Sequence, residues 1–393
     1  MKSETRIGII GAGPAGLTLG LLLRRAGIDC VILENRSREY IENRVRAGLL
    51  EHNTVDLFER LGVADRLHNE GLKHLGVNLS FDGFRTRIPF DELTDGRFIM
   101  IYGQQEVIRD LVKANLEREV PIHFECMATG IEGIESDFPR INYIYDQEEH
   151  TLACEFVAGC DGYHGISRGS MPNGSYQEFT RVYPFSWLGI LARAAPATEE
   201  LIYAYHERGF ALHSLRSGKI SRLYLQVDNQ EKLDHWTDGQ IWDELQLRLG
   251  DGKGFGLNRG EIFEKAITPV RSYLVDKMQY RNLFLAGDAA HIVPPTGGKG
   301  LNLAVADIRL LAEAFQAWYR HGSKELLDSY TENCLRRVWR AQEFSNYMTT
   351  LFHKQAPHGS FEYHLQKAKF NYICRSRAQA STIAENYVGL KEI

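Results

Sequence analysis

The feature that most constrains this chain is a glycine-rich turn near its start, GAGPAG at residues 11–16. The residues before it, 6–10, form a largely apolar run typical of a buried strand, and residues 17–25 have helical spacing that ends before Gly27. A second apolar run follows at 28–33. Because parallel neighbours need a crossover connection, this order predicts a β-α-β unit and a parallel sheet.

The same turn is suited to the pyrophosphate of a dinucleotide. Its glycines let the backbone approach phosphate oxygens, and the helix that follows offers free N–H groups and the positive end of its dipole. Glu34, at the end of the second predicted strand, is placed to accept hydrogen bonds from a ribose diol. A purely structural turn is the alternative, which this combination disfavours. The candidate cofactor-binding residues here are Gly11, Gly13, Ala15, Gly16 and Glu34.

Two later segments repeat the pattern of a strand followed by an acid and a glycine. LFLAGDAAH, residues 283–291, delivers Asp288 to the carboxyl edge of the sheet, where ligands bind in open α/β folds. AGCDG, residues 158–162, presents Asp161 in a similar way. The loop PPTGGKGLN, residues 294–302, leads into a helix whose N-terminus can stabilise a reduced, anionic isoalloxazine. Together these segments favour FAD over a nicotinamide as the tightly bound cofactor.

Alternation of apolar and polar residues predicts a second sheet. It runs through residues 77–90 around Asp82-Gly83, a dipeptide suited to a hairpin turn, and returns between residues 183 and 227. The expected strands there are 201–205, 210–214 and 221–227. We therefore predict an α/β protein with an FAD-binding Rossmann-like parallel-sheet domain, an inserted antiparallel β-sheet substrate domain and a helical C-terminal region. The expected boundaries are residues 1–73, 97–180 and 270–340 for the first, 74–96 and 181–269 for the second, and 341–393 for the third.

Charge and cysteine content indicate which partners and which cellular compartment to expect. The formal net charge of −5 over 393 residues is small, and no Lys/Arg block stands out. We therefore expect neither nucleic acid nor a membrane as a partner. The six cysteines lack a CxxC pair or a histidine at metal spacing, which is typical of buried thiols in a reducing cytoplasm. We expect a cytoplasmic protein with no disulfides and no metal site.

The three cofactor fingerprints resemble those of the single-component flavoprotein monooxygenases. Longer runs are similar, over essentially the whole chain, to members of that family that hydroxylate 4-hydroxybenzoate. These runs are NRVRAG (43–48), GCDGYHGISR (159–168), RVYPFSWLG (181–189), HIVPPTG (291–297) and AENYVGL (384–390). The resemblance implies a homodimeric FAD enzyme that uses NAD(P)H, O2 and a flavin C4a-hydroperoxide to make 3,4-dihydroxybenzoate. The same chemistry on 3-hydroxybenzoate or 4-aminobenzoate, or a flavin redox sensor that does not hydroxylate, are the alternatives.

The resemblance also implies how the substrate carboxylate is bound. Arg216 matches the family's carboxylate partner, and its planar fork can form two parallel bonds. Ser214 and Tyr224 add hydroxyl groups. By residue type alone, an arginine on a strand is more often solvated. The full set implied for substrate binding is Tyr203, Ser214, Leu215, Arg216, Tyr224 and Pro295.

A proton relay is implied at the phenol end of the substrate. Tyr203 is similar to the residue that bonds the phenol, and Tyr387 to the next residue of the relay; a tyrosine can both donate and accept. His74 matches the relay exit, and titration near neutrality would suit that task. Pro295 matches the residue whose carbonyl approaches the substrate hydroxyl. Each also has an ordinary structural interpretation, since buried tyrosines usually satisfy one hydrogen bond while they pack.

The resemblance completes the cofactor sites. Further residues implied for FAD are Arg44, Val45, Arg46, Ala47, Gly48, Leu49, Gln104, Gly300, Leu301 and Asn302. Those implied for the nicotinamide cofactor are Arg36, Tyr40, Arg44, His164 and Arg271. The better-known NADPH-specific members have an arginine directly after the acid that is Glu34 here, whereas this chain has Asn35. Arg36 and Arg38 can still meet a 2′-phosphate, so the sequence favours NADPH and leaves NADH open.

Overall fold

The computed structural model describes residues 3–390, and it begins with the predicted β-α-β unit. Strand β1 (Glu4–Ile10), helix α1 (Pro14–Arg25) and strand β2 (Cys30–Leu33) follow one another. Helix α1 starts earlier than its apolar spacing suggests because Pro14 fits the first turn, where its missing N–H leaves no bond unmade. Strand β1 pairs in parallel with β2 and with β11 (Glu148–Gly159), which confirms the predicted parallel sheet.

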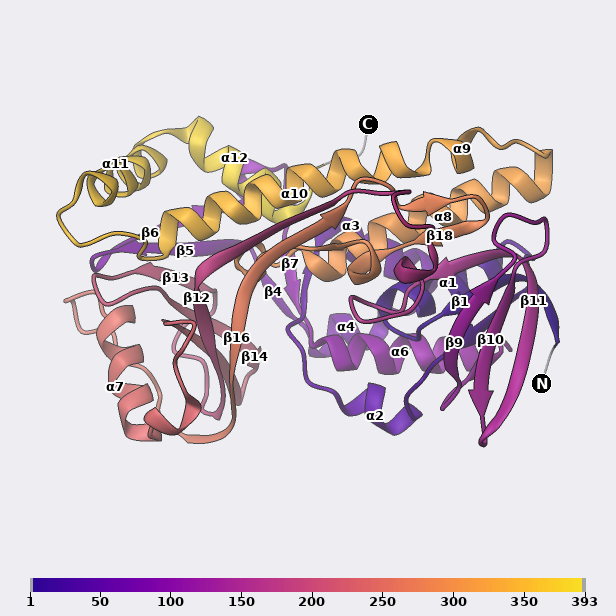
Figure 1. Ribbon diagram of the computed structural model, residues 1–393. Coiled ribbons are helices and arrows are strands. Elements are labelled where there is room, and N and C mark those ends of the chain that lie inside the picture. Colours follow the sequence, from indigo (N-terminus) through magenta and orange to yellow (C-terminus); the bar gives the residue numbers. More distant parts are fainter. Residues whose placement is uncertain (1–2, 391–393) are drawn as a thin grey trace.

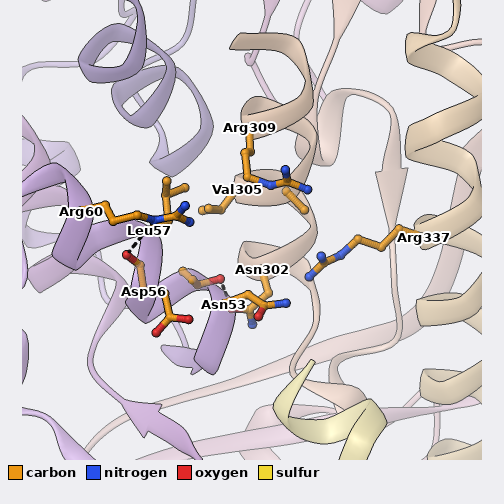
Figure 2. Close-up of a pocket in the computed structure, with 10 residues that line it drawn as sticks. Asn53, Asp56, Leu57, Arg60, Asn302, Val305, Arg309 and Arg337 are labelled. Atoms are coloured by element: carbon orange, nitrogen blue, oxygen red, sulfur yellow. Dashed lines mark hydrogen bonds between the residues drawn. The ribbon is translucent and has the colours of Figure 1, made fainter. Parts of the chain in front are cut away.

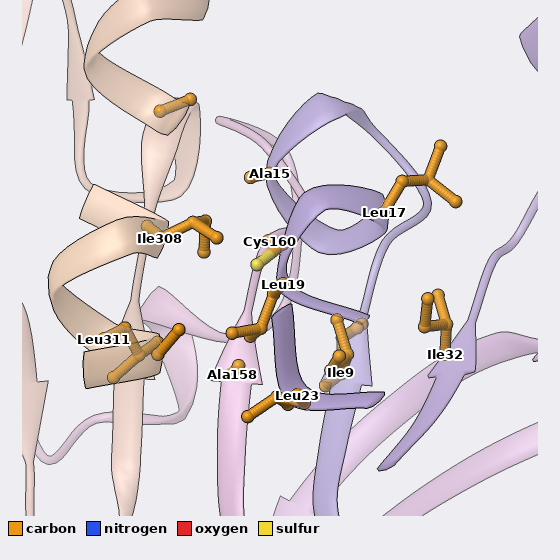
Figure 3. Close-up of a cluster of buried hydrophobic side chains, with 14 of the residues drawn as sticks. Ile9, Ala15, Leu17, Leu19, Leu23, Ile32, Ala158, Cys160, Ile308 and Leu311 are labelled. Carbon is orange, nitrogen blue, oxygen red and sulfur yellow. The ribbon is translucent and has the colours of Figure 1, made fainter. Parts of the chain in front are cut away.

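This first sheet has eight strands. Its central path is β17-β18-β11-β1-β2-β8, and β10 and β9 extend it from β11. The additional strands are β8 (Ile122–His123), β9 (Met127–Glu132), β10 (Arg140–Tyr145), β17 (Gln279–Tyr280) and β18 (Leu283–Leu285). Helix α1 contacts α6 (Gln104–Glu117) and α8 (Gly300–His321). Figure 3 shows the resulting core, where Leu19 of α1 and Ile308 of α8 pack with Ala158 of β11, all buried.

The second sheet also has eight strands, in the order β19-β16-β12-β15-β14-β13-β5-β6. Its strands are β5 (Gly76–Phe81), β6 (Phe84–Pro89), β12 (Glu178–Arg193), β13 (Ile202–Tyr205), β14 (Ala211–Ser217), β15 (Ile220–Val227), β16 (Glu261–Val275) and β19 (His291–Ile292). All neighbours are antiparallel except β13 and β5. Figure 1 shows β12 and β16 as long paired strands that join the two halves of the molecule.

The register of the second sheet separates its two faces. Leu188 of β12 lies opposite Leu225 of β15, and both pack in one apolar cluster with Leu245 of α7 (Asp238–Leu249). Since strand side chains alternate, Gly189 and its partner Tyr224 point to the opposite face. That face is turned toward the cavity described below.

The remaining helices are α2 (Arg38–Asn43), α3 (His52–Leu61), α4 (Asp65–Glu70), α5 (Phe90–Leu93), α9 (Glu325–Asp328), α10 (Tyr330–Phe352), α11 (Phe361–Arg375) and α12 (Arg377–Val388). A small antiparallel sheet contains β3 (Leu49–Glu51), β7 (Ile99–Ile101) and β4 (Leu72–His74).

Helix α10 crosses from one half to the other (Figure 1): its Cys334 belongs to the core of the first sheet and its Phe352 to that of the second. The predicted α/β class with its C-terminal helices is confirmed, while the exact domain boundaries stay a prediction. Among residues 3–390, no helix combines the length and apolar character needed to cross a membrane.

Candidate active site

A cavity of about 540 Å³ lies between the carboxyl edge of the first sheet and one face of the second. From the first half it is lined by Gly13, Ala15, Val45, Arg46, Ala47, Leu49, Gln104, Asp288, Gly300 and Leu301. From the second half it is lined by Trp187, Gly189, Arg222, Tyr224 and Glu264. Residues predicted from five separate segments to bind FAD therefore meet at one place.

Two helix N-termini open on this cavity. Neither α1, which follows Gly13, nor α8, which follows Lys299, has a side-chain cap at its start, and the first residues of both helices line the cavity. Uncapped N–H groups and the positive helix dipole favour anionic groups. Asp288 reaches the same cavity as an exposed carboxylate, an acceptor for hydroxyl groups. This donor and acceptor set fits the pyrophosphate, the ribityl chain and the isoalloxazine edge of FAD.

The glycine-rich turn has no space for side chains. A Cβ on Gly16 would lie 1.9 Å from the carbonyl oxygen of Gly11, which itself has a left-handed φ of 102°. Glu34 is buried, and its carboxylate accepts hydrogen bonds from the backbone N–H of Ala12 at 2.7 Å and of Arg36 at 2.9 Å. Glu34 therefore closes the turn, and its predicted ribose contact stays a prediction.

Two other predicted cofactor residues use their side chains within the protein. The Asp161 carboxylate accepts from the backbone N–H and the hydroxyl of Ser167, both at 2.9 Å. The Asn302 amide donates to the carbonyls of Leu49 and Gly298, and its oxygen accepts from Thr54 at 2.8 Å. Neither side chain lines the large cavity. Both hold the segments that form its wall.

Strand register brings the predicted substrate residues to one sheet face. Ser214 lies opposite Arg222, and Tyr203 and Tyr224 both lie opposite Leu212. Arg216 follows at a β-bulge between Leu215 and Ser217, and its guanidinium lies beside Gly103 and Gln105. Leu215 points to the other side. Of the predicted substrate residues, Tyr224 and Pro295 line the cavity itself.

Arg216 is a poorly hydrated cation. Its guanidinium lies against Gly103, where a Cβ would be 2.5 Å from Nη2, and donates to the Gln105 side-chain oxygen. Burial, together with the charge of nearby Arg222, lowers its pKa to about 10. At neutral pH the group is still charged, so it would gain from a carboxylate partner. Arg222 was not predicted from the sequence, although its position two residues before Tyr224 places it on the same face.

The two predicted relay tyrosines are in direct contact. The hydroxyl oxygens of Tyr203 and Tyr387 lie 2.5 Å apart, and Tyr203 also donates to the Thr296 carbonyl at 2.8 Å. Both rings are buried, and this burial raises both pKa values well above the usual range of a tyrosine. Both therefore stay neutral near pH 7, and a proton can pass only by exchange between hydroxyl groups.

His74 differs from what the sequence suggested. It is fully buried on β4, and neither imidazole nitrogen has a hydrogen-bond partner among residues 3–390. Burial lowers its pKa to about 4, so the expectation that it titrates near neutrality was wrong. The local sequence Leu72-Lys73-His74 gave no signal for this, because burial depends on segments that lie far away in the chain.

A buried ion pair that the sequence did not predict lies behind the cavity wall. Lys299 contacts Glu51 at 2.8 Å with both side chains 4% exposed, and Arg337 contacts the same carboxylate at 2.9 Å. These cations keep the pKa of Glu51 below its usual value although burial alone would raise it. Lys299 also donates to the Tyr387 carbonyl at 3.1 Å. The loop before α8 is thereby attached to the helix that carries the relay.

The residues predicted for the nicotinamide cofactor form two groups. The guanidinium carbons of Arg36 and Arg44 lie 5.3 and 5.8 Å from the ring centroid of Tyr40. His164 and Arg271 both contact the ring of Tyr163, the latter at 4.1 Å. Tyr163 was not among the predicted residues.

A second, much smaller cavity lies between α3, α8 and α10 (Figure 2). Arg60, Arg309 and Arg337 point toward it, and Asn302 forms part of its wall. Its volume of about 50 Å³ leaves room for a few water molecules, not for an aromatic ligand. This small cavity therefore cannot hold the substrate.

Comparison with known proteins agrees with this geometry. The family described as FAD binding domain matches residues 4–345. The p-hydroxybenzoate hydroxylase of Acinetobacter baylyi is 44% identical over 387 residues, which cover 98% of this chain and 96% of that protein. The rifampicin monooxygenase of Streptomyces venezuelae is 28% identical over 82% of this chain and 66% of its own length. Among solved structures, p-nitrophenol 4-monooxygenase from Pseudomonas putida DLL-E4 has a TM-score of 0.85 at 19% identity over the whole of both chains, which shows a shared fold.

Proposed function

Since the chain belongs to the FAD binding domain family of flavoprotein monooxygenases, we propose that it hydroxylates 4-hydroxybenzoate to 3,4-dihydroxybenzoate. The reaction consumes NAD(P)H, a proton and O2, and it releases NAD(P)+ and water. Of the two oxygen atoms of O2, one enters the ring ortho to the phenol and the other leaves as water.

The observation that carries this proposal is that one sheet face presents partners for both ends of the substrate. Arg216, at the bulge of β14 beside this face, is a half-buried cation suited to the carboxylate, with Ser214 and Tyr224 as hydroxyl donors. Tyr203, on the same face, has its hydroxyl 2.5 Å from that of Tyr387. 4-Hydroxybenzoate carries an anion and a phenol at opposite ends of a flat ring, and this arrangement matches that pattern.

The relay tyrosines make the substrate ring more reactive by removing its phenol proton. Tyr203 turns its hydroxyl from the Thr296 carbonyl and passes its own proton to Tyr387 as it takes the phenol proton. Tyr387 releases its hydroxyl proton toward the relay exit in turn, so neither tyrosine needs to ionise. A phenolate is more electron-rich than a phenol and reacts faster with an electrophilic oxygen. His74 remains the proposed exit of the relay, although its low pKa makes it a carrier that holds the proton only briefly.

The FAD-binding residues are proposed to be those that surround the two uncapped helix starts, together with Arg46 in the same cavity wall and Arg44, which is close to it in the chain. When bound, FAD would supply hydride acceptance from the nicotinamide and activation of O2. The start of α1 would hold the pyrophosphate and the start of α8 the isoalloxazine edge. Asp288 would accept hydrogen bonds from the ribityl chain.

NADPH is the proposed donor. Arg36 and Arg44 both lie over the Tyr40 ring, so two cations and an aromatic face meet where a 2′-phosphate and an adenine could bind. His164 and Arg271 are proposed to bind elsewhere on the same cofactor. A comparison of kcat/KM for NADPH and NADH tests the preference, and equal values would remove Arg36 from phosphate recognition.

Purified holoenzyme incubated with 4-hydroxybenzoate and NADPH tests the activity. We expect 3,4-dihydroxybenzoate by chromatography, close to one mole for each mole of NADPH oxidised. 3-Hydroxybenzoate and 4-aminobenzoate serve as comparison substrates, and higher coupled turnover with either would reassign the substrate. NADPH oxidation that yields only hydrogen peroxide with every aromatic acid would contradict hydroxylation.

We also propose a cytoplasmic homodimer. The location is supported by six cysteines that include no CxxC pair, of which five are buried. The dimer is supported by the family resemblance, and sedimentation velocity tests it.

A further inference from the structure

The wall of the large cavity contains one indole side chain whose polar atom points into the protein. Trp187 of β12 lines the cavity and packs against the ring of Tyr224, with ring centroids 4.7 Å apart. Its indole N–H donates to Nε2 of His353 at 2.6 Å. His353 does not line the cavity. The indole therefore presents only carbon atoms to the cavity.

His353 is held as a neutral acceptor by its surroundings. Its Nδ1 lies 2.9 Å from the Thr349 carbonyl, which can only accept, so Nδ1 carries the hydrogen and Nε2 is free to accept. The ring is stacked between Phe185 and Phe210, each with its centroid 4.3 Å away, and it is fully buried. This burial lowers the pKa of His353 to about 3, so the acceptor is retained throughout the neutral range.

The same turn of α10 also reaches the relay. The Thr349 hydroxyl lies 2.8 Å from that of Thr296, and the Thr296 carbonyl accepts from Tyr203 at 2.8 Å. Hydrogen bonds thus connect the indole on the carboxylate side of the site with the tyrosine on its phenol side. His353 and Trp187 are 166 residues apart in the chain, so this connection depends on how α10 packs on the second sheet.

We propose that His353 is a positioning residue that fixes the orientation of Trp187, and through it the apolar wall beside Tyr224 that shapes the aromatic-acid site. The proposal rests on the proposed function, because the wall matters for turnover only if the cavity binds an aromatic substrate. Without the acceptor, the indole N–H would be left unpaired in a buried site, and the ring would turn toward another partner or toward water. The site would then lose its fit for substrate.

Four variants of the full-length holoenzyme test this. His353→Leu removes the acceptor, whereas His353→Gln keeps an oxygen that can accept and an amide that can donate. Trp187→Phe removes the donor, and the double variant His353→Leu/Trp187→Phe removes both. Trp242→Phe is the matched control: its indole donates to the Gly260 carbonyl at 3.2 Å on the opposite face of the sheet. Each variant is assayed for KM and kcat with 4-hydroxybenzoate and for unfolding by denaturant.

We expect His353→Leu to raise KM by about tenfold with a much smaller change in kcat, and His353→Gln to stay within about threefold of the parent. In the Trp187→Phe background, His353→Leu should add no further rise, since the bond is already gone. Trp242→Phe should leave KM unchanged. An equal rise of KM in both backgrounds, or a similar rise in Trp242→Phe, would overturn the proposal. If His353→Leu does not fold, His353→Asn replaces it, because its side chain is too short to reach the indole.

A readout without turnover separates this inference from the proposed function. The difference in tryptophan emission between the parent and Trp187→Phe isolates Trp187 among the five tryptophans of the chain. The emission maximum of Trp187 obtained in this way should shift in His353→Leu and should not shift in His353→Gln. Should the parent hydroxylate no aromatic acid, the proposed function fails, while the emission shift still decides whether His353 holds Trp187. An unchanged emission in His353→Leu would overturn the inference in either case.

Discussion

At the site, different side chains are proposed to bind the carboxylate and to accept the phenol proton, and they differ in charge and burial. Arg216 is a half-buried cation whose hydrogen bond goes to the neutral oxygen of Gln105, so its charge is left for a ligand to balance. Tyr203 and Tyr387 are buried hydroxyls that bond each other. Recognition of the acid and activation of the phenol therefore depend on different residues and can be separated by substitution.

Arg216→Lys should raise the KM for 4-hydroxybenzoate by at least about tenfold, because an ammonium group cannot reproduce the two parallel bonds of a guanidinium. Steady-state kinetics measure this. Arg193→Lys is the control, because this arginine of β12 forms an exposed ion pair with Glu261 and does not line the cavity. If Arg216→Lys saturates at the same substrate concentration as the parent, Arg216 does not bind the carboxylate.

Tyr387→Phe should leave substrate binding within about threefold of the parent and lower the yield of hydroxylated product per NADPH, since only the relay hydroxyl is lost. Product chromatography together with NADPH consumption gives this ratio. Tyr363→Phe serves as the control. Tyr363 lies on α11, and its hydroxyl donates to the Asp82 carboxylate at 2.6 Å. A normal product yield in Tyr387→Phe would rule out the relay.

At the scale of elements, a buried pair positions the turn that carries Asp288. The Asp307 carboxylate on α8 accepts from the Gly287 backbone N–H at 3.0 Å and lies 2.7 Å from His291, with both side chains of this pair 2% exposed. The neighbouring carboxylate raises the pKa of His291. Helix α8 thus holds the Gly287–Asp288 turn from behind while its own N-terminus faces the cavity.

Asp307→Asn should therefore weaken FAD binding by about tenfold, since the loss of a buried charge partner loosens the turn. Quenching of flavin fluorescence on titration of apoprotein with FAD measures the change. Glu313→Gln on the same helix removes an exposed ion pair with Arg309 and should leave the affinity unchanged. Equal affinities for the parent and Asp307→Asn would show that the turn holds its shape without the pair.

At the scale of the whole molecule, burial of neutral histidines should make the fold sensitive to acid. His74 and His213 have pKa values lowered to about 4, and His353 to about 3, all by burial. The unfolded chain binds protons at these groups near pH 6.5, so their stabilisation is complete above that pH and is lost as the pH falls toward 4. His291 has a raised pKa and acts in the opposite direction at higher pH.

We expect the free energy of unfolding to fall by up to roughly 4 kcal/mol per pH unit between pH 6 and 4.5, as three more protons bind to the unfolded chain. Urea unfolding at several pH values measures this slope. His353→Gln should reduce it by about one third. A slope that does not change in His353→Gln would mean that this histidine is not buried and neutral in the folded protein.

Local pattern was sufficient for much of the fold. The glycine-rich turn, the strands on either side of it and the alternation at 201–227 predicted the parallel sheet, the antiparallel sheet and the cavity edge at which Asp288 lies. The apolar residues of strands and helices recur every two to four residues, so a short stretch of sequence is enough to reveal these elements. The substrate residues came from resemblance, and strand register explains why three of them share a face.

Tertiary structure decided what individual polar side chains do. The sequence predicted that Asn302 binds the cofactor, yet its amide forms hydrogen bonds within the protein. It also predicted a near-neutral pKa for His74, yet burial lowers that pKa. Trp187 and His353 carry no signal of their contact, because the partners lie far apart in the chain. Sequence determined the backbone framework through short-range periodicity. Burial, charge state and the partner of each polar atom depend on long-range packing, which only the folded chain defines.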